Sequence, residues 1–301
     1  MPSSFRRVVQ FTAPCQVEVI EEPLPAPDSD QVLVRTTLSA ISPGTERLIY
    51  QGDAPSEALD SSIEALSGDL EYPLTYGYAA VGRVVDSGSD VEPDWEGKRV
   101  FSFQPHASHF VASPESLLPL PDGARDVDGI LIPNLETAVN LLMDGRPLIG
   151  ERVVVFGQGV VGLLTTALAS TFPLEALFCL DPIPQRRSRS EAWGADRTFD
   201  PVSEFDAVRE ALGVTAMDAK EAEEQDEGSD LTFELSGKPP VLNDAISITG
   251  YDGRRRLIWE DDFTGRVCNS CLVRSARSAR NIVGGGRKTA GWTPFFECYR
   301  S

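Results

Sequence analysis

Apolar and polar positions follow one period in the first part of the chain and a different one in the second. Up to about residue 121, apolar side chains alternate with polar ones or form short β-branched runs between turns rich in Pro, Gly and Asp. This pattern predicts strands within residues 8–11, 16–20, 31–38, 80–85, 99–103 and 109–112, and residues 117–121 close the region. The polar, acidic stretch 53–70 predicts a surface loop or a short helix.

From Asp126 onward, helical spacing alternates with short apolar runs. Helices are predicted at 127–143, 185–193 and 241–248, and strands at 150–155, 176–180 and 231–235. The acidic stretch 218–230 predicts a solvated helix or loop. Strands that alternate with helices predict an α/β architecture with a doubly wound parallel sheet of the Rossmann type.

A chain of 301 residues is long enough for two domains with separate cores. We therefore expect a β-rich domain at 1–125, an α/β domain at 126–253, and a terminal segment at 254–301 that shows little periodicity of either kind.

A glycine-rich turn carries the clearest chemical signal. Gly157, Gly159 and Gly162 follow a buried strand and open an apolar helix, which gives the pattern Gly-x-Gly-x-x-Gly. The first glycine allows a tight bend, the second lets the backbone approach a pyrophosphate, and the third lets helix pack on strand. The phosphates would then lie on the first N–H groups of the helix, at Val160 and Val161. The turn predicts a dinucleotide site, and the alternative is a tight turn without a ligand.

Further residues are expected to bind the rest of the coenzyme. Asp181 ends the next predicted strand, 19 residues after the third glycine, where a carboxylate accepts hydrogen bonds from an adenosine ribose. It favours NAD(H), since it would repel the 2′-phosphate of NADP. Arg186 and Arg187 could instead pair with that phosphate, although solvent-facing helix arginines are the simpler interpretation. Ser236 and Gly237, which follow the strand at 231–235, are expected to border the same site.

Charge and composition narrow the function classes. The net charge is −19, which argues against a nucleic-acid or an anionic membrane partner. An acidic surface of this kind suits a high-salt cytoplasm, so a halophilic origin is a hypothesis. The apolar run 153–170 holds three glycines in six residues and β-branched residues at its start, so we do not interpret it as a membrane span. The first residues lack a secretory apolar segment, so a cytoplasmic location is expected.

The metal-ligating residue types form no convincing site. Cys268 and Cys271 have ligand spacing, but no second pair or nearby histidine completes a tetrahedral zinc site. His106 and His109 are the only histidines, and we interpret them as ordinary residues in a loop-to-strand stretch, with a shared metal as the alternative. Cys15 and Cys179 are expected to be ordinary buried thiols.

Several motifs together resemble one superfamily. They are the segments 41–46, 72–82, 97–100 and 136–138, the glycine turn, and Asp181. A β-rich front joined to a Rossmann domain with these motifs resembles the medium-chain dehydrogenases/reductases, whose first domain is GroES-like. The segment Ser39–Leu48 with the later Tyr-Pro-Leu and Gly-Tyr motifs is similar to a zinc-poor branch that includes hydroxyethyl-bacteriochlorophyllide dehydrogenases. The resemblance implies an oxidoreductase that acts on an alcohol or carbonyl.

The chain departs from the zinc-dependent members at the metal. Those members have Cys-Gly-Thr-Asp where this chain has residues 43–46, and their Gly-His-Glu is replaced by residues 77–79. Their third ligand falls near Pro133. Since Pro43 and the neutral Tyr78 cannot replace a thiolate and an imidazole, no catalytic zinc is expected.

The same resemblance suggests candidate catalytic residues. Thr45 matches the hydroxyl that relays the alcohol proton, Tyr78 occupies a former ligand position, and Thr137 matches a residue beside the nicotinamide. Without a metal, hydroxyl groups would have to stabilise the developing oxyanion. Glu136 is a candidate general acid/base. The alternatives are structural roles for Thr45 and Tyr78, and an ordinary carboxylate near a helix N-terminus for Glu136.

The terminal segment 254–301 differs from the rest of the chain. It holds ten basic and four acidic residues, and its sequence does not match the superfamily. Codons for residues 257–265 can be chosen so that a frame shifted by two bases reads Asp-Leu-Gly-Arg-Arg-Leu-Tyr-Arg, which is similar to the family. We therefore hypothesise a frameshift, with a basic interaction tail as the alternative. A frameshift would leave the Rossmann sheet incomplete and would make a family-type homodimer doubtful. The alternative to an active enzyme is then a non-catalytic dinucleotide-binding remnant.

Overall fold

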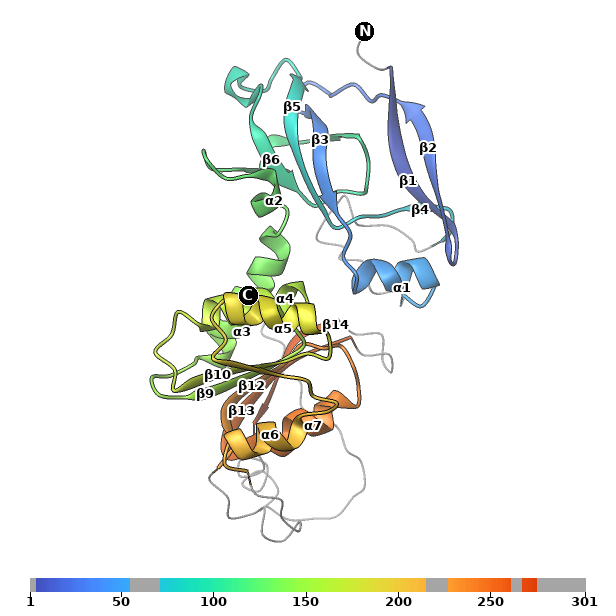
Figure 1. The fold of residues 1–301 in the computed structure, drawn as a ribbon. Helices are drawn as coiled ribbons and strands as arrows, with labels where there is room; N and C mark the ends of the chain where they lie inside the picture. Colours follow the sequence, from blue (N-terminus) through green and yellow to red (C-terminus); the bar gives the residue numbers. More distant parts are fainter. Residues whose placement is uncertain (1–3, 55–70, 215–226, 261–266, 275–301) are drawn as a thin grey trace, which may run out of the picture. The chain divides into compact units, whose positions relative to one another are not determined.

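The computed structural model describes residues 4–54, 71–214, 227–260 and 267–274, with the backbone alone from residue 251 onward. Two units divide the chain between Pro133 and Asn134, somewhat later than the predicted boundary at 125 (Figure 1). Much of the predicted loop 53–70, of the acidic stretch 218–230 and of the terminal segment lies outside the described residues. In the described part, no helix is both long and apolar enough to cross a membrane.

The first unit is built from two antiparallel sheets, and the alternating pattern predicted that it is rich in strands. One has the strand order β2–β1–β4, with β1 at Phe5–Ala13, β2 at Gln16–Pro23 and β4 at Leu74–Thr75. The other has the order β7–β3–β5–β6–β8, comprising β3 Val32–Ala40, β5 Ala79–Ser87, β6 Arg99–Ser102, β7 His109–Ala112 and β8 Leu118–Pro119. Alternate residues of these strands, such as Val32, Val34 and Val100, are fully buried and form the core of the larger sheet.

Short helices connect the strands of this unit. They are α1 at Thr45–Gln51, α2 at Asp126–Gly129, and two 3-10 turns at Pro93–Trp95 and Pro114–Ser116. The predicted helix 127–143 is in fact two helices, because α3 begins anew at Ile132 and runs to Gly145. Pro133 lies in the first turn of α3, where its missing N–H costs nothing, but it cannot continue the hydrogen bonding of α2.

The second unit is a six-stranded sheet with the order β11–β10–β9–β12–β13–β14. The first five strands are parallel, and β14 runs antiparallel to β13. Their bounds are β9 Arg152–Phe156, β10 Ala176–Leu180, β11 Arg197–Phe199, β12 Ser229–Glu234, β13 Thr249–Glu260 and β14 Val267–Arg274. In chain order the parallel strands lie 3-2-1-4-5, which is the Rossmann arrangement and confirms the predicted class.

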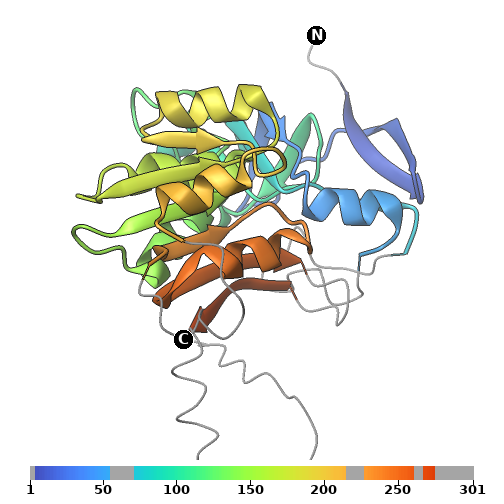
Figure 2. The same ribbon diagram turned by 60° about the horizontal axis from the view of Figure 1, so that its bottom comes forward.

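Helices cover both faces of this sheet (Figures 1 and 2). They are α3, α4 Val160–Ala169, α5 Pro184–Ala192, α6 Phe205–Ala211 and α7 Val241–Ile248. Val153 and Val155 of β9 pack in one cluster with α3 and α4, whereas Val154 and Phe156 pack in the other with α6 and α7. Burial on both faces explains why β9 is apolar without alternation.

The sheet continues beyond the predicted boundary at residue 253. Residues 254–260 extend β13, and residues 267–274 form β14 beside it. The structure thus places these residues in strands of the second unit, and the boundary at 253 stays a prediction. Main-chain pairing explains why a segment without hydrophobic periodicity continues the sheet. β13 pairs with β12 through backbone N–H and C=O groups, and this pairing does not depend on a pattern of side chains. The origin of the tail sequence stays a hypothesis, and residues 275–301 lie outside the described residues.

Candidate functional site

The strand order of the second unit places a switch point between β9 and β12. The chain leaves β9 for α4 on one face, whereas it leaves β12 for α7 on the other. Ligands of open α/β sheets bind in the crevice at the carboxyl ends of such strands. Here the glycine turn follows β9, and Ser236 and Gly237 follow β12. The topology thus brings together two sequence-predicted segments that are about 80 residues apart.

Each glycine of the turn has a separate structural reason. Gly157 has a φ of +80°, and a Cβ on it would lie 2.6 Å from the Cα of Ser236. A Cβ on Gly162 would lie 1.8 Å from the carbonyl oxygen of Gly157, so the helix can approach the turn only without a side chain there. Around Gly159, by contrast, nothing lies within 4 Å of the added Cβ. The first and third glycines serve packing, and the second leaves open space.

The open glycine also precedes the helix that would receive the phosphates. Gly159 is the N-cap of α4, and no side chain caps that helix. Val160 and Val161 form its first turn. The first N–H groups of an α-helix have no partner within the helix and carry its positive end. Open space beside these groups gives a site for an anion such as a pyrophosphate.

Asp181 lies where predicted, at the end of β10, but its carboxylate faces inward. The residue is 2% exposed. Oδ2 accepts a hydrogen bond from the N–H of Gln158 and Oδ1 accepts one from the N–H of Ile183, each at 2.8 Å. Arg186 lies 3.4 Å from Oδ2, and its side chain is 46% exposed. Both carboxylate oxygens are therefore already hydrogen-bonded to the protein's own backbone, and Arg186 partly neutralises the carboxylate's charge.

Gln158 is a site residue that the sequence reasoning missed. It is fully buried within the glycine turn, and its amide nitrogen donates to the carbonyl of Val155 at 3.2 Å. Its amide oxygen accepts from Thr166 of α4 at 3.0 Å and from Ser190 of α5 at 2.8 Å. The side chain therefore connects the turn to two helices. A polar residue inside an otherwise apolar run was the available signal.

Glu234, at the end of β12, is a second missed residue. It is fully buried, and its Oε1 accepts hydrogen bonds from both the N–H and the hydroxyl of Ser236. Its Oε2 has no hydrogen-bond partner in the described part of the chain. Burial raises the pKa of Glu234, and the bonds from Ser236 oppose that shift. The carboxyl holds Ser236 against the glycine turn, and Gly237 follows with a φ of +62°.

The remaining candidates lie on helix α3 and in the first unit. Glu136 is exposed on α3, and Thr137 next to it is half-buried. Thr45 is the first residue of α1. Tyr78 lies just before β5 and packs edge-on against Phe103, with 5.6 Å between the ring centroids.

The two histidines of the first unit do not share a ligand position. Nε2 of His106 lies 2.7 Å from Oε2 of Glu46, whereas Nδ1 of His109 lies 3.2 Å from the hydroxyl of Ser108. Burial, with the nearby Arg35 and Arg6, lowers the pKa of His109. Across the described residues, no three His, Cys, Asp or Glu side chains gather in a way that could hold a metal ion.

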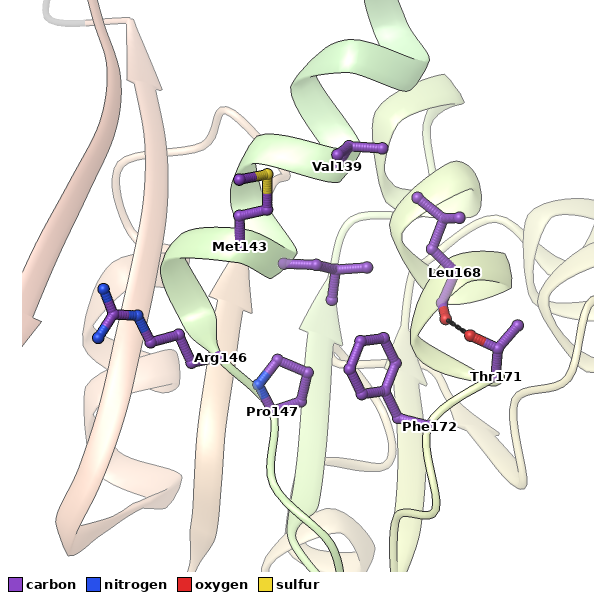
Figure 3. A pocket seen from close by; sticks show the side chains of 8 residues that line it. Val139, Met143, Arg146, Pro147, Leu168, Thr171 and Phe172 are labelled. Carbon is purple, nitrogen blue, oxygen red and sulfur yellow. Dashed lines mark hydrogen bonds between the residues drawn. The ribbon is translucent and has the colours of Figure 1, made fainter. Parts of the chain in front are cut away.

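A separate hollow of about 390 Å³ lies between α3 and the end of α4 (Figure 3). Its walls are mostly apolar, and Thr171 on its edge donates a hydrogen bond to the carbonyl of Leu168 at 2.7 Å. The lining residues are Val139, Leu142, Met143, Arg146, Pro147, Leu168, Thr171 and Phe172. None of the predicted site residues lines it.

No protein-family model matches the chain. Among sequence relatives, (R,R)-butanediol dehydrogenase of Bacillus subtilis is 27% identical over 241 residues, covering 70% of this chain and 66% of the relative. L-threonine 3-dehydrogenase of Pyrococcus furiosus is 24% identical over 301 residues, covering 89% and 79%. The chain spans 59% of sorbitol dehydrogenase 1 of Saccharomyces cerevisiae, which is 26% identical over 224 residues covering 61% of this chain.

Solved structures agree on the fold. A dehydrogenase of Sinorhizobium meliloti, solved with NADP, superimposes with a TM-score of 0.70 at 20% identity, covering 88% of this chain and 80% of that one. An alcohol dehydrogenase of Escherichia coli CFT073 in complex with NADH gives a TM-score of 0.67 at 18% identity, covering 86% and 77%. Together with the glycine turn and the strand order, these relatives and structures support the resemblance to the medium-chain dehydrogenase/reductase superfamily.

Proposed function

We propose that this protein transfers a hydride between a nicotinamide dinucleotide and a small alcohol or carbonyl substrate, without a catalytic zinc ion. The observation that supports the proposal most directly is the crevice after β9. There an open glycine precedes an uncapped helix at the switch point of a Rossmann sheet. Relatives named as butanediol, sorbitol and threonine dehydrogenases support the alcohol class of substrate.

We propose NAD(H) as the first coenzyme and NADP(H) as an alternative. The carboxylate of Asp181 opposes a 2′-phosphate by charge repulsion. Arg186 lies 3.4 Å from that carboxylate and is half exposed, so it offsets part of the repulsion and offers a cation to a phosphate. Structural neighbours have been solved with NADH and with NADP.

The donor set does not fit a catalytic zinc ion. At the positions that match the ligands stand Pro43, Tyr78 and Pro133, and neither proline has a side-chain atom that can bind a metal. Glu46, which matches the carboxylate of the zinc-family motif, contacts His106 instead. Developing charge on the substrate oxygen then needs hydrogen-bond donors, for which the hydroxyls of Thr45 and Tyr78 are the candidates. Glu136 is a candidate general acid/base, although its exposure favours an ordinary surface role.

The test combines coenzyme binding with turnover. NADH and NADPH are titrated by fluorescence, and a panel of secondary alcohols and ketones is assayed with each coenzyme before and after treatment with 1,10-phenanthroline. We expect binding, measurable turnover of at least one substrate, and no loss with the chelator. Binding without any turnover would favour the remnant of a disrupted dehydrogenase, and inhibition by the chelator would contradict zinc independence.

A further inference from the structure

A buried histidine in the first unit makes contacts that its position in the sequence does not suggest. His106 lies in the loop between β6 and β7 and is 7% exposed. Its Nε2 is 2.7 Å from Oε2 of Glu46, and its Nδ1 is 3.0 Å from the hydroxyl of Ser39 near the end of β3. An ionised carboxylate only accepts hydrogen bonds, so Nε2 carries the hydrogen in that contact, and Nδ1 shares a hydrogen bond with the hydroxyl of Ser39. Both ring nitrogens are then bonded.

The carboxylate that His106 contacts organises the start of α1. Glu46 is 3% exposed and follows Thr45, the first residue of the helix. Its Oε1 accepts a hydrogen bond from the N–H of Ser42 at 2.7 Å, and its own N–H donates to the carbonyl of Ser42 at 3.1 Å. The residue at the N-cap, Gly44, supplies no side-chain cap. Glu46 therefore closes the loop that leads into Thr45, and His106 fixes Glu46.

The backbone of His106 reaches the other candidate hydroxyl. Its N–H donates to the carbonyl of Tyr76 at 3.2 Å, and its carbonyl accepts from Val9 at 2.9 Å. A Cβ on Gly77 would lie 2.7 Å from the nitrogen of His106, so the two segments touch through their main chains. Tyr78 is the next residue. One histidine thus joins the segment that carries Thr45 to the segment that carries Tyr78.

We infer that His106 is a positioning residue, which holds Thr45 through Glu46 and Tyr78 through the backbone of Tyr76–Gly77. This inference rests on the proposed function, because it gives the two hydroxyls their role. A displacement of about 1 Å at a reacting group can cost about 100-fold in rate, so the loss of such a hub should reduce turnover strongly.

The neighbourhood of the ring makes chemical rescue feasible. A hollow of about 220 Å³ is lined by Ser39 and His106 together with Arg7, Val8, Val9, Val19, Ala107 and Ser108. Removal of the imidazole ring leaves additional space next to this hollow. A free imidazole molecule therefore has a route to the hydroxyl of Ser39 and the carboxylate of Glu46.

The experiment compares His106→Ala and His106→Gln with His109→Ala as the matched control, because His109 contacts Ser108 rather than Glu46. For the Ala variant at position 106 we expect NADH affinity within twofold of wild type, since the nucleotide crevice belongs to the other unit. Its kcat should fall about 100-fold. Added imidazole should raise the kcat of His106→Ala at least tenfold. The Gln variant, which keeps a donor and an acceptor, should retain more activity than the Ala variant. The control His109→Ala should keep the kcat of wild type and should not respond to added imidazole.

Hydrogen exchange supplies a readout that needs no substrate. In His106→Ala, or in the Gln variant if the Ala variant fails to fold, the amides of residues 42, 44–46 and 76–78 should exchange faster, with β3 and β5 unchanged. An active variant with kcat within threefold of wild type, or with unaltered exchange in both segments, would overturn the inference alone. A wild type that binds NADH but turns over no substrate would overturn the proposed function, and with it the catalytic role assigned to this histidine.

Discussion

Substitution by alanine is expected to have opposite effects at the second and third glycines of the turn. It should weaken coenzyme binding at Gly159 and destabilise the fold at Gly162. In Gly159→Ala the added methyl group meets nothing within 4 Å, and the φ of −72° suits any residue. Loss of a glycine N-cap destabilises the folded protein by up to about 1 kcal/mol. Alanine also lowers the conformational entropy of the unfolded chain, which stabilises the fold by about 0.4–1 kcal/mol. The two contributions nearly cancel, so the melting temperature should stay within about 4 °C of wild type.

The same methyl group projects into the space proposed for the pyrophosphate. Hydrogen bonds to charged groups contribute about 1.5–3 kcal/mol each, so losing one or two of them should weaken NADH binding by about 3 kcal/mol. That corresponds to a Kd about 100-fold higher, which fluorescence titration or calorimetry can measure.

Gly162→Ala supplies the contrast. Its Cβ would lie 1.8 Å from the carbonyl oxygen of Gly157, and backbone cannot move aside as a flexible side chain can. Overpacking of this kind costs about 1–3 kcal/mol or more, so the melting temperature should fall by several degrees even without coenzyme. If Gly159→Ala binds NADH like wild type while remaining folded, the phosphates do not lie at this turn, and the assignment of the site is wrong.

Three further predictions follow from buried or paired groups of the second unit. Because burial raises the pKa of Glu234 above its ordinary value of 4.5, the folded state loses stability relative to the unfolded state as the pH rises from about that value toward the raised one. The melting temperature of Glu234→Gln should therefore gain on wild type between pH 4 and pH 8, and an equal difference at both ends would contradict the shift. Burial also raises the pKa of the Cys179 thiol to about 12, whereas Cys15 is exposed, so the expectation that Cys15 is buried was wrong. Peptide mapping after iodoacetamide treatment at pH 8 should therefore find Cys15 modified in the folded protein and Cys179 modified only after unfolding. In Arg186→Ala the cation beside Asp181 is lost, and NADPH affinity should fall about tenfold relative to NADH, with Arg189→Ala on the same helix as the control; a constant coenzyme ratio would show that Arg186 does not face the 2′ position.

The sequence predicted the centre of the second unit well for physical reasons. β9 is buried on both faces, so its apolar run is unbroken, and the glycine triplet marks the turn that follows. The helix α4 also has a long apolar stretch, and α7 has apolar residues at helical spacing. By contrast, α1 and α6 were not predicted. Each has only seven residues, and α1 buries a charged residue, Glu46, on the face where a helical pattern would require an apolar one.

The contacts within the site could not be predicted in the same way. His106 and Glu46 are 60 positions apart, and Gln158 and Ser190 are 32 apart, so neither pairing leaves a periodic trace in the sequence. Asp181 was located correctly from its spacing, yet its inward orientation depends on two backbone N–H groups that only the folded turn brings near. The sequence thus indicated which segments meet at the crevice, and only the structure showed how their polar groups are paired.

The three strands that end at the crevice place a polar residue at or just after their ends, and these residues explain why the crevice keeps its shape. Gln158 after β9, Asp181 after β10 and Glu234 at the end of β12 are all buried. A buried polar group is costly unless it is hydrogen-bonded, so each one favours the single backbone arrangement that provides its partners. Together they bind the glycine turn, two helices and Ser236 in fixed positions before any coenzyme arrives. A preorganised crevice requires little ordering on binding, so NADH should raise the melting temperature and should slow hydrogen exchange only at the N–H groups that bind it.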